Sequence, residues 1–100
     1  MGGTGWTSWS PDGARVAFDS GTAANREVWT IDVNTGERKQ ITRIGANASF
    51  PGWSPDGTQL SFYLYRGGTL EIWVVGADGR AAEPFDGDLA GGGGVGPDTL

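Results

Sequence analysis

One pattern recurs along this chain of 100 residues at a fixed offset of 44 positions. The pentapeptide Trp-Ser-Pro-Asp-Gly stands at 9–13 and again at 53–57. Three later residues keep the same offset, namely Phe18 with Phe62, Glu27 with Glu71, and Trp29 with Trp73. Because a chance match of one pentapeptide would not bring later residues into register, the chain contains two copies of one structural unit.

A period in the mid-forties is typical of one four-stranded blade of a β-propeller. Strands are expected at 6–10, 15–18, 27–33 and 38–42, and again at 50–54, 59–64, 71–75 and 81–85, although Pro84 weakens the last of these. The fold class is therefore all-β, with two four-stranded antiparallel blades. Blade 1 is predicted over 6–44 and blade 2 over 45–87, with a start segment at 1–5 and a glycine-rich flexible tail at 88–100.

The repeated residues are expected to have structural roles. No stretch shows helical apolar spacing, whereas Val16 and Phe18 alternate with polar residues as in a strand. Asp-Gly after Pro is a hairpin signal, because Gly accepts positive φ and the carboxylate accepts backbone N–H groups. The predicted structural set is Trp9, Asp12, Gly13, Phe18, Trp29, Trp53, Asp56, Gly57, Phe62 and Trp73.

Composition excludes several classes of function. The net charge of −5 disfavours non-specific binding to nucleic acids or to an anionic membrane, and no apolar run is long enough to cross a membrane. The chain has neither Cys nor His, which removes disulfides, zinc-finger sites and His-dependent triads. We therefore expect no enzyme activity, no metal and no cofactor.

Two further patterns look like catalytic or metal sites, but we interpret both as turns. The segment 32–37 resembles the start of a calcium loop but lacks the later ligands, so it is expected to be a hairpin turn. Asp12 and Asp56 stand one per blade, so each is expected to cap its own turn rather than to form a carboxylate pair.

The repeat resembles a known family. Trp-Ser-Pro-Asp-Gly, a strand ending in Phe, Glu-(Val/Ile)-Trp and then Asp-Val-Asn-Thr-Gly-Glu with Ile-Thr are similar to the WD40-like PD40 repeat of TolB-like and tricorn-type propellers. The resemblance covers about residues 6–86, and repeat two departs from it after Trp73. It implies a propeller that is six-bladed in TolB-like proteins, where it binds protein partners in the periplasm. No basic and apolar leader opens this chain, so its own compartment stays open.

Two blades cannot close a propeller, because only one inter-blade interface forms within the chain. The outer faces would then stay bare, with Trp29 and Phe62 as candidate exposed residues, and such patches are rare on soluble monomers. Copies that pack head to tail form a ring when the rotation closes. We expect a homo-oligomer, with three chains and six blades favoured over four chains. The alternatives are a fragment cut from a longer protein, which would not fold cleanly, and a protein partner that supplies the missing blades.

Five residues are candidates for binding. Trp6 and Phe50 differ between the repeats and begin the strand that would line the central channel. Arg26, Tyr65 and Arg66 lie in the expected connections between the second and third strands, which vary between the repeats.

The expected function is a non-catalytic scaffold or protein-interaction module that self-assembles into a closed ring. Three alternatives stay open. The chain could be a fragment of the gating propeller of a prolyl-oligopeptidase or tricorn-like peptidase, a carbohydrate-binding propeller, or an engineered or evolutionary-model propeller fragment.

Overall fold

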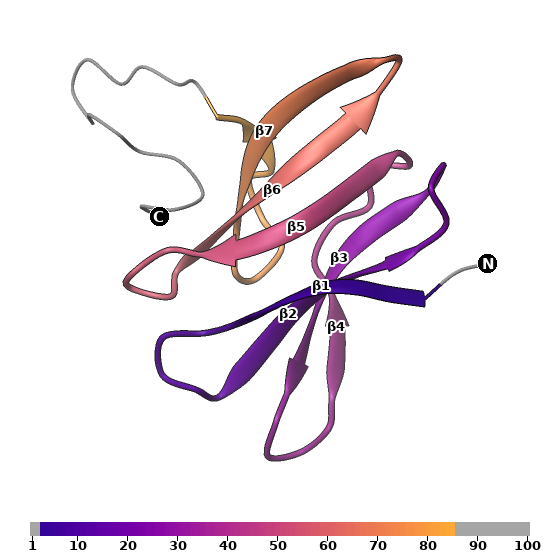
Figure 1. Ribbon diagram of the computed structural model, residues 1–100. Helices are drawn as coiled ribbons and strands as arrows, with labels where there is room; N and C mark the ends of the chain where they lie inside the picture. The colour runs from indigo at the N-terminus through magenta and orange to yellow at the C-terminus, as the bar shows by residue number, and fades with distance from the viewer. Residues whose placement is uncertain (1–2, 86–100) are drawn as a thin grey trace.

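The computed structural model describes residues 3–85 of the chain as strands and short turns (Figure 1). Blade 1 holds β1 (Gly3–Trp9), β2 (Arg15–Gly21), β3 (Arg26–Asp32) and β4 (Arg38–Gln40). Blade 2 holds β5 (Asn47–Trp53), β6 (Gln59–Arg66), β7 (Thr69–Gly76) and β8 (Glu83–Pro84). Within these residues no helix is long and apolar enough to span a membrane. The prediction of an all-β chain is confirmed, while the expected tail at 88–100 lies outside the described residues.

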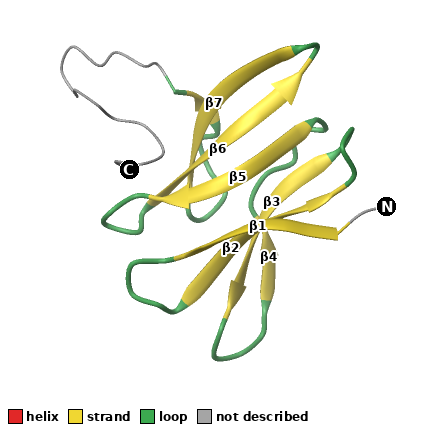
Figure 2. Cartoon of the chain, viewed as in Figure 1, coloured by secondary structure: helices red, strands yellow, loops and turns green. Residues whose placement is uncertain are grey.

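Consecutive strands pair antiparallel in each blade. Figure 2 shows these strands in yellow and the loops that join them in green. The two blades join into one eight-stranded sheet through a single parallel pair, Arg26 opposite Asn47. There the backbone N–H of Arg26 donates to the carbonyl of Ala46 at 2.8 Å. We call the first strand of each blade, β1 or β5, the inner strand. The pairing of each inner strand with the next strand is irregular, between Thr4 and Thr7 in β1 and between Ser49 and Gly52 in β5.

Strand bounds differ from prediction mainly where hairpins close. β2 and β6 run further than expected and reach Gly21 and Arg66, so the connections between second and third strands are short turns. The fourth strands are shorter than expected, and β8 has two residues. Pro84 explains part of this, because it has no N–H to donate to a ladder.

The hydrophobic core lies between the blades. In β2, Ala17 belongs to this core, so its neighbours Val16 and Phe18 lie on the opposite face of blade 1. In β6 the opposite set of residues is buried, because Leu60 and Phe62, the repeat equivalents of Val16 and Phe18, belong to the core. The two blades therefore use different faces of the repeat in this contact. Blade 2 contributes the face that carries Leu60 and Phe62, and blade 1 contributes the opposite face, which carries Ala17.

We name these faces by their residues. The Trp9 face of blade 1 consists of Trp9, Val16, Phe18, Trp29 and Ile31, which are cross-strand neighbours. The repeat-equivalent Trp53 face of blade 2 consists of Trp53, Leu60, Phe62, Trp73 and Val75. The latter packs on the Ala17 face of blade 1, which carries Ala17, Val28 and Ile41.

The expectation that Phe62 is bare is wrong. Phe62 is fully buried because the Trp53 face is the one that blade 1 covers. The sequence could not decide which of the two faces of each blade would be used, since both carry apolar residues. Trp29 lies on the face of blade 1 that blade 2 does not cover, where it is half-buried.

Candidate functional site

An open cleft of about 600 Å³ lies where β1 and β5 come together beside the ends of β2 and β3. It is lined by Trp6, Asp19, Ala23, Arg26, Asn47, Ser49 and Phe50. Three of the five predicted binding residues, Trp6, Phe50 and Arg26, thus meet in one place. Sequence reasoning proposed Arg26 on other grounds than Trp6 and Phe50, and the pairing of blade 1 with blade 2 brings the three together.

Trp6 and Phe50 are repeat equivalents that contact each other across the seam between the blades. Their ring centroids are 5.8 Å apart at an interplanar angle of 60°, an edge contact. Tyr63 extends the set, since its ring lies 5.9 Å from that of Phe50. Trp6 is 54% exposed and Phe50 52% exposed, so both rings remain accessible from the cleft.

Asp19 is the charged residue of this site that sequence reasoning missed, together with Ala23, Asn47 and Ser49. Its side chain is 2% exposed, and its Oδ1 accepts a hydrogen bond from Nε of Arg26 at 2.6 Å. Its Oδ2 accepts from the backbone N–H of Phe50 at 2.9 Å. A signal was available, because the repeat places Tyr63 where blade 1 has Asp19, and a carboxylate amid strand residues needs a partner.

The hydrogen bond that Phe50 donates to Asp19 supports an unusual backbone at Phe50. Phe50 has a φ of 56°, in the left-handed region, which costs a non-glycine residue about 1–2 kcal/mol. This conformation coincides with the ladder break between Ser49 and Gly52 and turns the Phe50 side chain out to 52% exposure. The buried carboxylate therefore helps to place the aromatic ring at the cleft.

Arg26 is held from two sides rather than lying in a variable loop. It is the first residue of β3, and its guanidinium also donates to the carbonyl of Gly21 at 2.6 Å. Tyr65 and Arg66 likewise belong to a strand, the end of β6, and do not line the cleft. Arg66 lies 5.5 Å from the ring of Trp73 and 3.9 Å from Glu71. The expectation that these residues sit in loops is wrong, because both hairpins are tighter than the sequence indicated.

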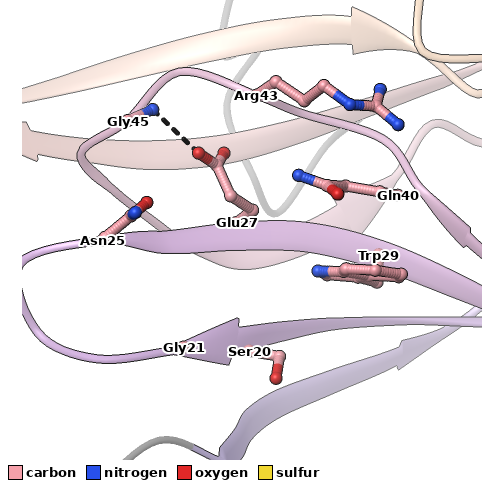
Figure 3. A pocket seen from close by; sticks show the side chains of 8 residues that line it. All are labelled: Ser20, Gly21, Asn25, Glu27, Trp29, Gln40, Arg43 and Gly45. Carbon is pink, nitrogen blue, oxygen red and sulfur yellow. Dashed lines mark hydrogen bonds between the residues drawn. The ribbon is translucent and has the colours of Figure 1, made fainter.

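A second hollow, of about 500 Å³, lies in blade 1 beside β2, β3 and the connection from β4 to β5 (Figure 3). The carboxylate of Glu27 accepts from the backbone N–H of Gly45 at 2.8 Å, the dashed line in that figure, and from the hydroxyl of Thr42. The same hydroxyl accepts from the backbone N–H of Val28 at 2.9 Å. Trp29 and Gln40 line this hollow as well. These bonds bind β3 to the connection into blade 2, which is a structural role.

The two Asp residues of the repeated pentapeptide each cap their own turn. Oδ1 of Asp12 accepts from Oγ of Ser10 at 2.6 Å and from the backbone N–H of Ala14 at 2.9 Å. The bond from Ser10 is the main cause that lowers the pKa of Asp12. Asp56 has the same arrangement with Ser54 and Thr58, and the bond from Ser54 is the main cause that lowers its pKa to about 2.

The predicted calcium-like segment also forms a turn. Oδ1 of Asp32 accepts from the backbone N–H groups of Asn34 at 2.8 Å and Thr35 at 3.1 Å. Among residues 3–85 no group of three or more acidic side chains is placed to hold a metal ion. The carboxylates of Asp12, Asp32 and Asp56 are thus used in turns, and that of Asp19 is used in the seam between the blades.

Comparison with known proteins is consistent with this architecture. The PD40 family, described as the TolB beta propeller domain, matches residues 2–90. A curated relative, the Protein TolB homolog of Protochlamydia amoebophila (strain UWE25), is 42% identical over 36 residues, which cover 36% of this chain and 8% of that protein.

Two solved structures resemble the fold. A candidate TolB of Agrobacterium tumefaciens superposes with a TM-score of 0.75 at 28% identity, covering 82% of this chain and 30% of that one. TolB from Acinetobacter baumannii superposes with a TM-score of 0.68 at 26% identity, covering 86% and 22%. The chain thus spans less than a third of each of these relatives. On the extent of the family match and the agreement in fold, the chain belongs to the PD40 family of TolB β-propeller domains.

Proposed function

We propose that this chain is a non-catalytic propeller module that closes a ring with further copies of itself, three chains giving six blades. The observation that carries the proposal is the contrast between Trp9 and Trp53. These residues hold the same position in the repeat, yet Trp9 is 62% exposed and Trp53 is 7% exposed. The difference arises because the Trp53 face is packed on blade 1, whereas no described residue covers the Trp9 face in the same way.

The same contrast recurs along the interface. A Cβ added at Gly57 would meet Pro11 at 3.6 Å, and one at Gly79 would meet the carbonyl of Ile41 at 3.2 Å. At the corresponding turn glycines of blade 1, Gly13 and Gly36, nothing lies within 4 Å. Blade 1 thus presents an unused version of the surface by which blade 2 binds.

In this proposal the complementary surface is the corresponding face of blade 2. Val28, on the face of blade 1 that blade 2 covers, is fully buried, whereas its repeat equivalent Ile72 in blade 2 is only half-buried. A second copy could therefore place its Trp9 face on this face of blade 2. That contact is heterologous, so it generates a ring if the rotation closes.

Repeat equivalence also specifies contacts across the new seam. Within the chain, Nε1 of Trp53 donates to the carbonyl of Ser8 at 2.9 Å, and Arg15 lies 5.2 Å from the ring of Trp53. The repeat equivalent of Ser8 is Gly52. Trp9 of one chain would accordingly donate to the carbonyl of Gly52 in the next. Because propellers have about four to eight blades, an even ring needs two to four chains, and six blades match the TolB-like number.

Native mass spectrometry together with sedimentation equilibrium tests the proposal. The wild-type chain of 10.4 kDa should be found as a three-chain species, and Trp9→Glu should reduce it to monomer. Lys39→Glu is the matched control, because Lys39 is exposed and its counterpart in β8, Glu83, stays exposed although its blade is packed. Self-assembly is overturned if the wild-type chain is a folded monomer at a concentration about 100 times a dissociation constant of about 1 μM. A two-chain or four-chain ring overturns the six-bladed form.

A further inference from the structure

The cleft between the inner strands is lined by aromatic and polar side chains that the proposed assembly of chains does not explain. We propose that it binds a neutral carbohydrate, which rests against Trp6 and Phe50 and exchanges hydrogen bonds with the polar lining. All of its lining residues come from one chain, so the proposal does not depend on assembly. The volume of about 600 Å³ lies within the range of about 300–1,000 Å³ that small-ligand sites occupy.

The two aromatic rings supply an apolar platform. Trp6 and Phe50 meet edge to face, at 60°, and each is more than half exposed, so ring surface remains open to a ligand. An aromatic ring packs well on the C–H face of a pyranose, because that face is apolar and carries partial positive charge that complements the negative ring face. Exposed aromatic pairs of this kind are costly to leave in water, which favours a ligand that covers them.

The platform is held in place before any ligand arrives. Asp19 binds the N–H of Phe50 and fixes the turned-out conformation of that residue. Tyr63 supports the Phe50 ring from the second blade, in edge contact at 5.9 Å. A ring that is already placed loses little conformational freedom on binding, which suits weak ligands such as sugars.

The charges in the cleft favour a neutral ligand. The carboxylate of Asp19 and the guanidinium of Arg26 are joined at 2.6 Å, so each is neutralised by the other. A quaternary ammonium ligand would have to compete with Arg26 for the carboxylate, and an anion would have to compete with Asp19 for the guanidinium. Neutral polar groups complete the lining, because Ser49 contributes a hydroxyl and Asn47 an amide whose Nδ2 is fixed on the carbonyl of Ala23 at 2.9 Å. Hydroxyls of a sugar can both donate to and accept from such groups.

An extended peptide fits the cleft less well. A peptide that adds to a sheet needs a regular row of backbone N–H and C=O groups along the strand edge. The ladders of both inner strands are broken at the aromatic residues, between Thr4 and Thr7 around Trp6 and between Ser49 and Gly52 around Phe50. The strands present side-chain rings there, and not a continuous edge.

Saturation-transfer NMR and tryptophan fluorescence titration test the proposal on the full chain. The probes are cellobiose, maltotriose and N,N′-diacetylchitobiose, each up to about 10 mM, which detects dissociation constants in the millimolar range. At least one sugar should bind. Trp6→Ala should weaken binding at least about tenfold, as expected when one ring contact and its buried area are lost. Trp9→Ala, which removes a similarly exposed Trp outside the cleft, should leave sugar binding unchanged.

A second variant separates binding from folding. Phe50→Gly removes the ring but suits the φ of 56°, so the chain should stay folded and lose sugar binding. Trp9→Glu distinguishes the two proposals, because it should dissociate the three-chain assembly and leave sugar binding intact. The proposal is overturned if none of the three sugars binds, if Trp6→Ala and Phe50→Gly bind as the wild type does, or if only a choline or acetate probe binds.

Discussion

The backbone N–H of Phe50 in blade 2 donates to the buried carboxylate of Asp19 in blade 1 at 2.9 Å. The same carboxylate binds Arg26 at 2.6 Å, so one side chain joins the two blades and fixes the wall of the cleft. This link is not part of the repeat, because Tyr63 and Leu70 stand at the equivalent positions in blade 2. It is therefore a feature of this one seam.

Asp19→Ala should lower the free energy of unfolding by about 3 kcal/mol, because it removes the buried carboxylate that binds Nε of Arg26 and leaves the N–H of Phe50 without its acceptor. Urea denaturation followed by tryptophan fluorescence measures the change. Asp19→Asn is the control, since an amide oxygen can still accept from Phe50 and the loss should be smaller. Equal losses for the two variants would show that the charge pair, and not the bond to Phe50, carries the effect.

Glu27 and Glu71 are repeat equivalents with different surroundings, and their alanine variants should differ. Glu27→Ala leaves the hydroxyl of Thr42 and the N–H of Gly45 without an acceptor, at a cost of about 2 kcal/mol or more. Glu71 is partly exposed and binds the indole of Trp73 and, at 3.9 Å, Arg66, so Glu71→Ala should cost less than about 1 kcal/mol. Thermal or urea unfolding of the pair is decisive, and a larger loss for Glu71→Ala would contradict the role given to Glu27.

The turn carboxylates of Asp12 and Asp56 make the free energy of unfolding depend on pH in the acid range. The pKa of Asp56 is lowered from 3.8 to about 2, chiefly by the hydrogen bond from Ser54, and the pKa of Asp12 is lowered mainly by Ser10. A carboxyl whose pKa is lower in the folded state stabilises the fold above its unfolded pKa, and this stabilisation is lost as pH falls through the folded value. The contribution of Asp56 is thus present above about pH 4 and declines toward about pH 2.

Comparison of the wild type with Asp56→Ala across this pH range isolates the carboxyl of Asp56. The difference in their urea midpoints should shrink as the pH is lowered from about 5 to about 2. A difference that stays constant, or grows in acid, would show that the turn does not favour the ionised carboxylate.

Ser61 is a site where the repeat suggests a stabilising change. Its Oγ is buried and has no hydrogen-bond partner, and its repeat equivalent in blade 1 is Ala17. Ser61→Ala should therefore raise the free energy of unfolding by about 1 kcal/mol, because an unpaired buried hydroxyl is removed. Ser54→Ala is the contrast, since the hydroxyl of Ser54 binds Asp56 at 2.7 Å and its loss should be destabilising. A loss of stability on Ser61→Ala would indicate that this hydroxyl is used in the folded protein.

The strands and their turns could be predicted from the sequence because their causes are local. Alternation at Val16 and Phe18 and the Asp-Gly turns depend only on neighbouring residues. The ends of the hairpins were predicted less accurately, because Arg26 and Tyr65 extend their strands by pairing with Gly21 and Leu70 on the other side of the turn. Asp19 was missed for the same reason, since its importance comes from Phe50, which lies 31 positions away.

By itself the sequence determined that the chain holds two copies of one blade, because a repeat at a fixed offset forces both copies to adopt the same local structure. It also placed Trp6 and Phe50 among the candidates for binding. Only the tertiary structure decided which face of each blade is buried, since both faces carry apolar residues and the choice depends on how one sheet packs on the other. That choice makes Trp53 a core residue and leaves Trp9 exposed at the same position of the repeat.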